Sequence, residues 1–498
     1  MTAVHEPTPN PTAPPQADRE PARAPEPPRS PAEDLRLLLE RMKRAQRTQG
    51  APDYAARMKS LKALERMMIE HKDEIATAIS KDFGNRSRHE SLLAEVFLSV
   101  EAAKHAMRHL REWMEPERRA VHFTFLPARV RVFYQPLGVI GVISPWNYPV
   151  QLAIGPLVGA LAAGNRAIIK PSELTPETSE VLRRIVAATF PADQVAVVTG
   201  GTDVGEAFTK LPFDHLVFTG STRVGKIVMK AASENLVPVT LELGGKSPCV
   251  VGDDIPLEEA AMKVMTGKLF NGGQTCIAPD YVMVPADRRD AFVDAAKKAV
   301  QKLYPRLADN PDYTSVINDR HYQRLQSYLV DAEKQGASLV AINPSAESLD
   351  PTKRKLAPTL VLGATEAMTV MQDEIFGPIL PVLTYQNLAE AIDYINDHPR
   401  PLALYYLGYD GTAIDRMLRE TISGGVTINE TLLHFAQDDI PFGGVGASGL
   451  GHYHGYEGFE SFSKKKPVFF QARVNSTALM RPPFGPMIER VLRFFLGK

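Results

Sequence analysis

The sequence contains very little cysteine, no surplus of either charge and no long hydrophobic run. Cys249 and Cys276 are the only two cysteines in 498 residues. They are too few for a disulfide framework, which predicts a reducing compartment, the cytoplasm. The formal net charge of -1 lacks the basic surplus that is typical of nucleic-acid-binding proteins. The most apolar stretch, residues 150–164, is interrupted by Gln151 and Pro156 and is shorter than the roughly 20 residues that span a bilayer.

Proline is concentrated at the N-terminus, in residues 1–31. This segment has no apolar core of the kind found in a signal peptide. It cannot bury enough surface to offset its chain entropy, so we expect it to be disordered. From residue 32 to about 115, apolar residues recur at i, i+3, i+4 and i+7, which predicts helices. A chain of this length is expected to form two or three domains.

The pattern then changes to strands that alternate with helices. Residues 121–136 alternate like a pair of strands. Repeated strand–helix units up to about residue 244 predict an α/β domain with a parallel sheet covered by helices on both faces. A nucleotide should bind at the carboxyl ends of such strands. A second round of the same alternation predicts a second α/β domain.

The last segment, residues 472–498, predicts one short amphipathic helix. Ile488, Val491, Leu492 and Phe495 would share one face of it. We expect that face to pack on the body of the protein or to cover the mouth of a site. Peripheral contact with a membrane is the alternative, because the segment is too short to cross one.

The run "HLVFTGSTRVG" places Gly220 at the end of a predicted strand, then Ser221, then Gly225 near the start of a helix. This is similar to the dinucleotide fingerprint, in which free backbone amides at a helix N-terminus bind a pyrophosphate. Thr222 takes the place of the second glycine of that fingerprint. An ordinary turn therefore explains the pattern about as well.

The run "KPSE" follows another predicted strand. Lys170 and Glu173 could hydrogen-bond a ribose there, as an acidic residue does in dinucleotide-binding folds. On local grounds a capped helix start is the simpler interpretation, with Ser172 or Thr175 as the cap.

Two further residues have side chains suited to catalysis. Glu242 ends an apolar run beside two glycines, where burial would raise its pKa toward the range of a general base. Asn147 lies between two prolines, and its amide could donate to a developing oxyanion. Taken singly, an exposed edge residue or a paired glutamate explains Glu242 about as well, and an ordinary turn explains Asn147 better.

Cys276 lies in the glycine-rich, polar run "FNGGQTCIAPD". We expect an accessible, partly stabilised thiolate in that setting, and therefore a nucleophile. The absence of a nearby histidine in the sequence argues against a Cys–His hydrolase. Cys249, in the apolar run "SPCVV", is expected to be a small buried core residue.

The order of these motifs is more informative than any one of them. The runs "SPWNYP", "KPSE", "FTGST", "LELGGKSP", "FNGGQTCIAPD" and "EIFGPILPV" follow one another over about 240 residues. This order closely resembles the aldehyde dehydrogenase superfamily over residues 35–471. The runs "APDY" and "PFGGVGASGLGHYHGYEGF" resemble its class 3 branch, and within that branch the bacterial coniferyl-aldehyde dehydrogenases.

The resemblance implies the aldehyde dehydrogenase fold. A Rossmann-like NAD(P)-binding domain would take residues 32–120 and 136–244, and an α/β catalytic domain residues 245–447. A β arm, residues 121–135 and 461–471, would bridge a homodimer. The resemblance also implies oxidation of an aldehyde, aromatic or medium- to long-chain aliphatic, to the acid.

The same resemblance assigns roles to individual residues. Cys276 would be the nucleophile, Asn147 and the backbone amide of Cys276 would hold the oxyanion, and Glu242 would activate water. No metal is implied. The implied cofactor-binding residues are Trp146, Lys170, Ser172, Glu173, Gly220, Ser221, Gly225, Glu374 and Phe376. Glu173 would favour NAD, because a carboxylate repels the 2′-phosphate of NADP, although relatives often accept both.

Two alternatives and one departure remain. Acylating, CoA-dependent relatives share the cysteine but commonly lack the glutamate at position 242. A non-catalytic binding protein on the same scaffold would be expected to lose Cys276, Glu242 or Asn147. Gly272 departs from the family pattern, in which another small residue is common, and predicts a more mobile cysteine loop.

Overall fold

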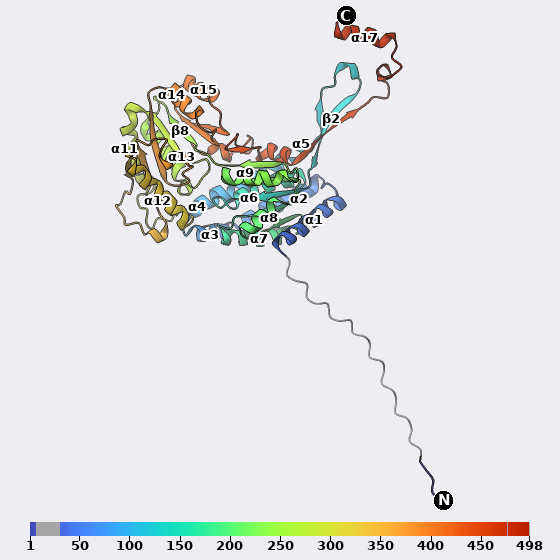
Figure 1. The fold of residues 1–498 in the computed structure, drawn as a ribbon, viewed down its shortest axis with the longest axis horizontal. Helices are drawn as coiled ribbons and strands as arrows, with labels where there is room; N and C mark the ends of the chain where they lie inside the picture. Colours follow the sequence, from blue (N-terminus) through green and yellow to red (C-terminus); the bar gives the residue numbers. More distant parts are fainter. Residues whose placement is uncertain (6–29, 476, 498) are drawn as a thin grey trace.

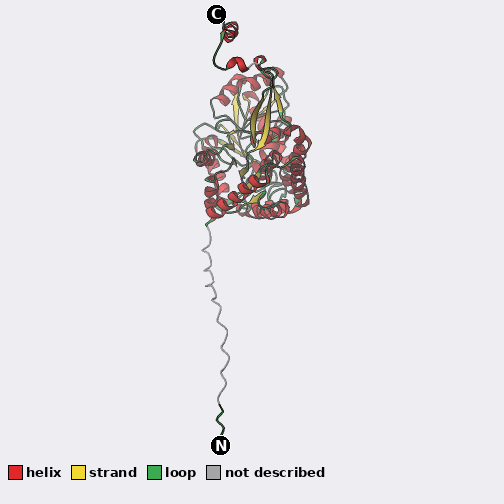
Figure 2. Ribbon diagram, turned by 90° about the vertical axis from the view of Figure 1, so that its right-hand side faces the viewer, coloured by secondary structure: helices red, strands yellow, loops and turns green. Residues whose placement is uncertain are grey.

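The computed structural model describes residues 1–5, 30–475 and 477–497. Most of the predicted disordered segment, residues 6–29, lies outside the described residues. Figure 1 shows two α/β bodies side by side and a narrow arm that carries the C-terminus away from them. Figure 2 shows the strands lying among the helices of the body, with the C-terminal segment projecting from it.

Helices form the N-terminal part of the chain, as the apolar periodicity predicts. Ser30 caps the first of them, with its side chain accepting from the amide of Glu33. The helices are α1 Pro31–Gln49, α2 Tyr54–Glu70, α3 Lys72–Phe83, α4 Arg88–Ser91, the π-helix η1 Leu92–Phe97 and α5 Leu98–Met114.

The first body contains a six-stranded sheet in the order β15-β7-β6-β3-β4-β5. All neighbours are parallel except β15, which is antiparallel to β7. The strands are β3 Val139–Ile143, β4 Arg166–Lys170, β5 Val195–Val197, β6 His215–Thr219, β7 Val239–Glu242 and β15 Gly449–Leu450. The helices between them are α6 Gln151–Ala163, α7 Pro176–Thr189, α8 Thr202–Thr209 and α9 Thr222–Ser233.

The order of these strands creates a crevice. From β3 the chain proceeds outward to β4 and β5, then returns to the other side of β3 as β6. Adjacent parallel strands whose connections leave in opposite directions separate at their carboxyl ends, and ligands of α/β sheets bind there. Helix α6 packs behind this edge with every residue buried.

The second body contains a seven-stranded sheet in the order β10-β11-β12-β9-β8-β13-β14, parallel except for β10. Cys249 lies on β8 and is fully buried, as predicted. The strands are β8 Pro248–Val251, β9 Tyr281–Pro285, β10 Ser338–Ala341, β11 Thr359–Leu362, β12 Ile379–Tyr385, β13 Ala403–Leu407 and β14 Gly425–Ile428. The helices are α10 Leu257–Leu269, α11 Arg289–Leu303, α12 Asp319–Lys334, α13 Thr369–Gln372, α14 Leu388–Asn396 and α15 Gly411–Glu420.

The arm is a three-stranded antiparallel sheet in the order β1-β2-β16. Its strands are β1 Glu117–Arg119, β2 Arg129–Pro136 and β16 Ser463–Phe470. The predicted strand pair in residues 121–136 is therefore only half correct. Its first half is not extended but forms the 3₁₀ turn Phe123–Phe125. The first strand that pairs with β2 is the charged β1, which lacks an apolar alternation.

The C-terminal helix α17, Pro486–Leu496, follows α16, Gly455–Ser461, and β16. None of its residues is buried, and Phe495 contacts Phe123 of the arm at 5.5 Å between ring centroids. The expectation that this helix packs on the body of the protein is wrong for this structure, because α17 lies at the far end of the arm (Figure 1). Among the described residues, no helix is long and apolar enough to cross a membrane.

The start of α7 is capped from another helix. The Asp82 carboxylate, near the end of α3, accepts from the amides of Glu177 (3.0 Å) and Thr178 (2.9 Å). The predicted caps are wrong: Thr175 makes no side-chain cap bond, and Ser172 instead accepts from the amide of Leu174. A carboxylate that satisfies two orphan amides takes the place that a local hydroxyl would otherwise fill.

We predict that Asp82→Ala lowers the free energy of unfolding by about 1–2 kcal/mol, because it leaves two amides of α7 without acceptors. The midpoint of urea denaturation, followed by circular dichroism, measures this. Asp350→Ala is the control, because Asp350 caps only an exposed 3₁₀ turn and its loss should cost less than about 0.5 kcal/mol. Equal effects of the two substitutions would contradict the prediction.

Candidate active site

A cavity of about 210 Å³ opens at the crevice of the first sheet and extends to the second body. Eight residues singled out in the sequence line it, and five separate segments of the chain supply them. They are Trp146, Asn147, Gly220, Ser221, Glu242, Cys276, Glu374 and Phe376. Lys170, Ser172, Glu173 and Gly225 do not line it. His321 and Arg324, on α12, line it without having been predicted.

The loop before Cys276 is held tightly. Asn271 and Gly272 have φ of 54° and 61°, and residues 271–275 are all buried. A Cβ added at Gly272 would lie 2.9 Å from the carbonyl oxygen of Thr314. The Gln274 side chain bonds the carbonyls of Asn271 and Ser315 and the amide of Ile317. These bonds do not support the predicted mobility, since glycine at 272 allows this close, left-handed turn rather than loosening it.

Cys276 is half-buried and lines the cavity. Burial raises its pKa above the ordinary value, and the nearby carboxyl groups of Glu374 and Glu242 raise it further. The expectation of a partly stabilised thiolate is therefore not met in this structure. A base or a neighbouring positive charge would favour the anion.

Glu242, the last residue of β7, is 2% exposed. Neither of its carboxyl oxygens has a hydrogen-bond partner among the described residues. Burial raises its pKa well above the ordinary value, which confirms the shift expected from its apolar surroundings. The Glu242 carboxyl group therefore has a raised proton affinity and forms no ion pair with another described residue.

Asn147 projects into the cavity from the loop after β3. One N–H of its amide donates to the carbonyl of Gln274 at 3.1 Å, directly before the cysteine segment. An amide nitrogen has two hydrogens, so the second one remains available for a ligand. Its backbone carbonyl accepts from Arg86 (2.9 Å) and from the Asn271 amide (3.1 Å).

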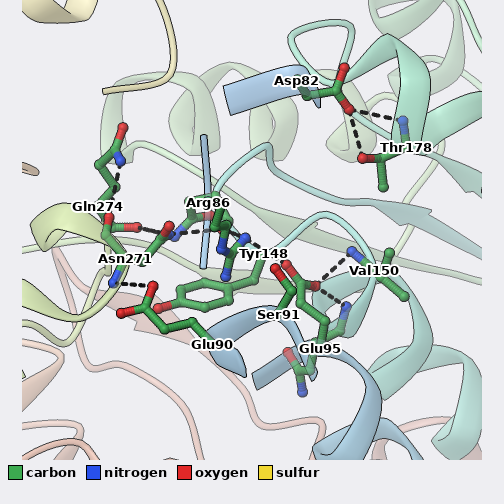
Figure 3. A network of polar contacts seen from close by, with 12 residues as sticks. Asp82, Arg86, Glu90, Ser91, Glu95, Tyr148, Val150, Thr178, Asn271 and Gln274 are labelled. Carbon is green, nitrogen blue, oxygen red and sulfur yellow. Dashed lines mark hydrogen bonds and ion pairs between the residues drawn. The ribbon is translucent and has the colours of Figure 1, made fainter. Parts of the chain in front are cut away.

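Arg86 is the centre of a buried polar network that the sequence analysis missed (Figure 3). Its guanidinium pairs with Glu95 at 2.8 Å, and both side chains are 0% exposed. The second oxygen of Glu95 accepts from the amides of Val150 and Gln151, where α6 begins. The guanidinium also lies 4.7 Å from the ring centroid of Tyr148. The signal that could have revealed the network is Glu95, a charged residue inside the apolar run "LLAEVFLSV".

The predicted nucleotide residues lie at strand ends of the crevice. Ser221 caps α9 by accepting from the amide of Val224, and Gly220 and Ser221 line the cavity where this helix begins. Gly225 lies further back, where an added Cβ would meet Leu243 at 2.6 Å. Gly225 therefore allows close packing of α9 and does not line the cavity. Lys170, at the end of β4, bonds Glu173 at 2.9 Å.

Glu374 and Phe376 bring the second body to the cavity. Arg324 donates to the backbone carbonyls of Glu374 and Ile375, and Phe376 takes a left-handed φ of 51°. Burial raises the pKa of Glu374 to about 8, and one of its oxygens has no partner among the described residues. A Cβ at Gly244 would lie 1.9 Å from Glu374, so only glycine fits between them.

This arrangement fits a dinucleotide. A helix N-terminus can offer amides to a pyrophosphate, and a lysine–glutamate pair lies at the end of β4, two strands along the sheet from β6. At the other end of the cavity, Trp146 and Phe376 form an edge-to-face pair at 5.3 Å, next to the unpartnered oxygen of Glu374. An aromatic wall beside a buried hydrogen-bond acceptor suits the ring and the ribose of a nicotinamide nucleoside.

Comparisons with known proteins identify the family to which the chain belongs. The chain matches the aldehyde dehydrogenase family over residues 15–468. It is 53% identical over 458 residues to a probable coniferyl aldehyde dehydrogenase of Pseudomonas aeruginosa, covering 92% of this chain and 95% of that one. It is 39% identical to aldehyde dehydrogenase family 3 member A2 of Mus musculus, covering 92% and 93%.

A solved structure with the same fold supports the family assignment. The substrate-bound state of Staphylococcus aureus AldH superposes with a TM-score of 0.87 at 39% identity and covers 92% of this chain and 99% of that one. The predicted fold class and the predicted superfamily are therefore confirmed. By its motifs, its fold and its relatives, this chain is a member of the aldehyde dehydrogenase family.

Proposed function

We propose that this protein oxidises an aromatic aldehyde of the coniferyl type to its carboxylic acid, with NAD(P) as cofactor and Cys276 as nucleophile. The observation that carries the proposal is that Cys276, Asn147 and Glu242 line one cavity at the sheet crevice. A soft nucleophile, an oxyanion donor and a base are what acyl transfer requires. The coniferyl substrate rests on the names of relatives such as that of Pseudomonas aeruginosa.

The first step would join the cysteine sulfur to the aldehyde carbon. The thiol proton leaves to a base or to solvent, the C=O bond opens, and a thiohemiacetal oxyanion forms. The free N–H of Asn147 and the backbone amide of Cys276 would hold that oxygen. NAD(P) would supply the hydride acceptor. When the carbon has lost its hydride, its C=O bond re-forms and the acyl group remains on the Cys276 sulfur as a thioester.

Glu242 would act in the second step. Its raised pKa suits the transfer of a proton from water, and neither of its carboxyl oxygens is engaged in a hydrogen bond with another described residue. Hydroxide adds to the thioester carbon, the carbon–sulfur bond breaks, and the thiol recovers a proton. The presence of Glu242 favours hydrolysis over transfer to CoA.

We also propose that NAD is preferred over NADP. Glu173 lies beside Lys170 at the end of β4, where a carboxylate would bond a ribose hydroxyl and repel a 2′-phosphate. The cytoplasm is the proposed location, since neither cysteine forms a disulfide and both remain free thiols.

Cys276→Ala is expected to lower kcat for NAD-dependent oxidation of coniferyl aldehyde by at least about 10⁴-fold, because no other group at the cavity floor can form the thioester. NADH absorbance measures the rate. Cys249→Ala is the matched control, because Cys249 is buried on β8 and does not line the cavity. Its kcat should stay within about twofold of the wild-type value. Retention of activity by Cys276→Ala would refute the nucleophile assignment.

We propose in addition that the arm bridges a homodimer. The outer strand β16 is mostly exposed along its length, including Phe469 and Phe470. An exposed, partly apolar edge strand invites pairing with a second chain. Sedimentation velocity should give twice the chain mass for the wild type, and Phe469→Asp should shift the population toward monomer. A monomeric wild type at micromolar concentration would overturn this assignment.

A further inference from the structure

Two histidines and an aspartate come together beside α5, outside the cavity that contains Cys276. His105 and His109 lie one helical turn apart on α5, and Asp439 belongs to the loop that precedes β15. One nitrogen or oxygen atom of each of these three side chains lies within 4.8 Å of the other two. None of the three residues lines the Cys276 cavity, so the cluster is separate from the site described above.

Both histidines project from one face of α5. Residues four apart in a helix lie on the same side of it, and two histidines at this spacing can bind one metal ion. Their rings lie 4.6 Å apart between centroids. Trp113, four residues beyond His109, packs against the rings of His105 and His109 at 5.7 and 6.0 Å. This shared contact keeps the two imidazoles side by side.

The Nε2 atom of His105 is buried and has no hydrogen-bond partner among the described residues. The side chain is only 8% exposed, and buried polar atoms nearly always have a partner. A carboxylate oxygen of Asp439 lies 3.7 Å away, which is too far for a hydrogen bond. Two ligands of a tetrahedral Zn²⁺ ion with bonds of about 2.0–2.1 Å lie about 3.4 Å apart. The distance between Nε2 and the carboxylate is therefore close to that of two atoms bridged by an ion.

The neighbouring groups suit a cation at this position. Glu112 lies 3.8 Å from Nδ1 of His109, and metal-bound histidines usually have a carboxylate or carbonyl at their second nitrogen. Burial lowers the pKa of His105 below its ordinary value, and His109 and Arg108 act in the same direction. The ring is therefore neutral at physiological pH, which is the form that binds metals. The positive charge of Arg108 opposes an ion, and the nearby carboxylate of Asp438 offsets that charge.

We propose that His105, His109 and Asp439 form a binding site for a divalent transition-metal ion, with Zn²⁺ as the best match. Imidazole and carboxylate ligands suit Zn²⁺, and three protein ligands leave a fourth position for water. Bringing the three ligand atoms to bonding distance moves only His109 and Asp439, whose side chains are 38% and 87% exposed. The ion would join α5 to the loop before β15, two segments far apart in the sequence, and would stabilise the contact between them.

Calorimetric titration of the untagged, full-length Cys276→Ala protein with ZnCl₂ tests the site. This substitution removes the accessible thiol, which is itself a zinc ligand, and the remaining Cys249 is buried. One Zn²⁺ ion should bind per chain. Asp439→Asn and His109→Gln change side chains that are exposed or partly exposed, so the fold should persist, and each should weaken binding at least about tenfold. Zn²⁺ should also raise the unfolding temperature of the Cys276→Ala parent more than that of the Asp439→Asn variant.

His71→Gln in the same background is the matched control. His71 contacts Glu74 at 3.2 Å, but it belongs to no group of three potential metal ligands within the described part of the chain. Its substitution should leave the Zn²⁺ affinity unchanged. Absence of Zn²⁺ binding tighter than about 100 µM, as expected if the space beside His105 holds only a water molecule, would overturn the site. An equal loss of affinity in the control, or an affinity that neither Asp439→Asn nor His109→Gln changes, would overturn it as well.

Discussion

The buried ion pair between Arg86 and Glu95 is the contact on which the arrangement of the site depends. One nitrogen of Arg86 donates to both Glu95 and the backbone carbonyl of Asn147. Glu95 also accepts hydrogen bonds from the backbone amides of Val150 and Gln151, where α6 begins. The side-chain amide of Asn271, in the loop before Cys276, donates to the same carbonyl of Asn147. Burying two charges is costly, so such a pair does more to fix geometry than to add stability. Here it joins the helical segment, the loop after β3 and the cysteine loop.

Burial also sets the electrostatics of the cavity. It raises the pKa of Glu242, of Glu374 and of the Cys276 thiol, which favours the protonated form of each group. Each group would ionise more readily beside a positive charge, and the oxidised nicotinamide ring carries one.

The sequence predicted the parts of this account that depend on local pattern or motif order. The alternating strands and helices gave the two sheets, and eight of the twelve predicted site residues line one cavity. Contacts made only in three dimensions escaped prediction. Asp82 caps a helix about 95 residues away, and Arg86 holds a carbonyl 61 residues away. The prediction for the first half of the arm was also wrong. The apolar residues Phe123–Phe125 form a 3₁₀ turn, and the charged segment β1 supplies the strand that pairs with β2.

The central claim is that Cys276 carries the acyl group and Glu242 releases it. The most direct measurement is the intact mass of Glu242→Gln after mixing with NAD and coniferyl aldehyde. The account predicts that the protein gains the mass of one acyl group, that peptide mapping places it on Cys276, and that one equivalent of NADH forms before turnover stalls. An unmodified protein that turns over at the wild-type rate, or an acyl group on another residue, would contradict it.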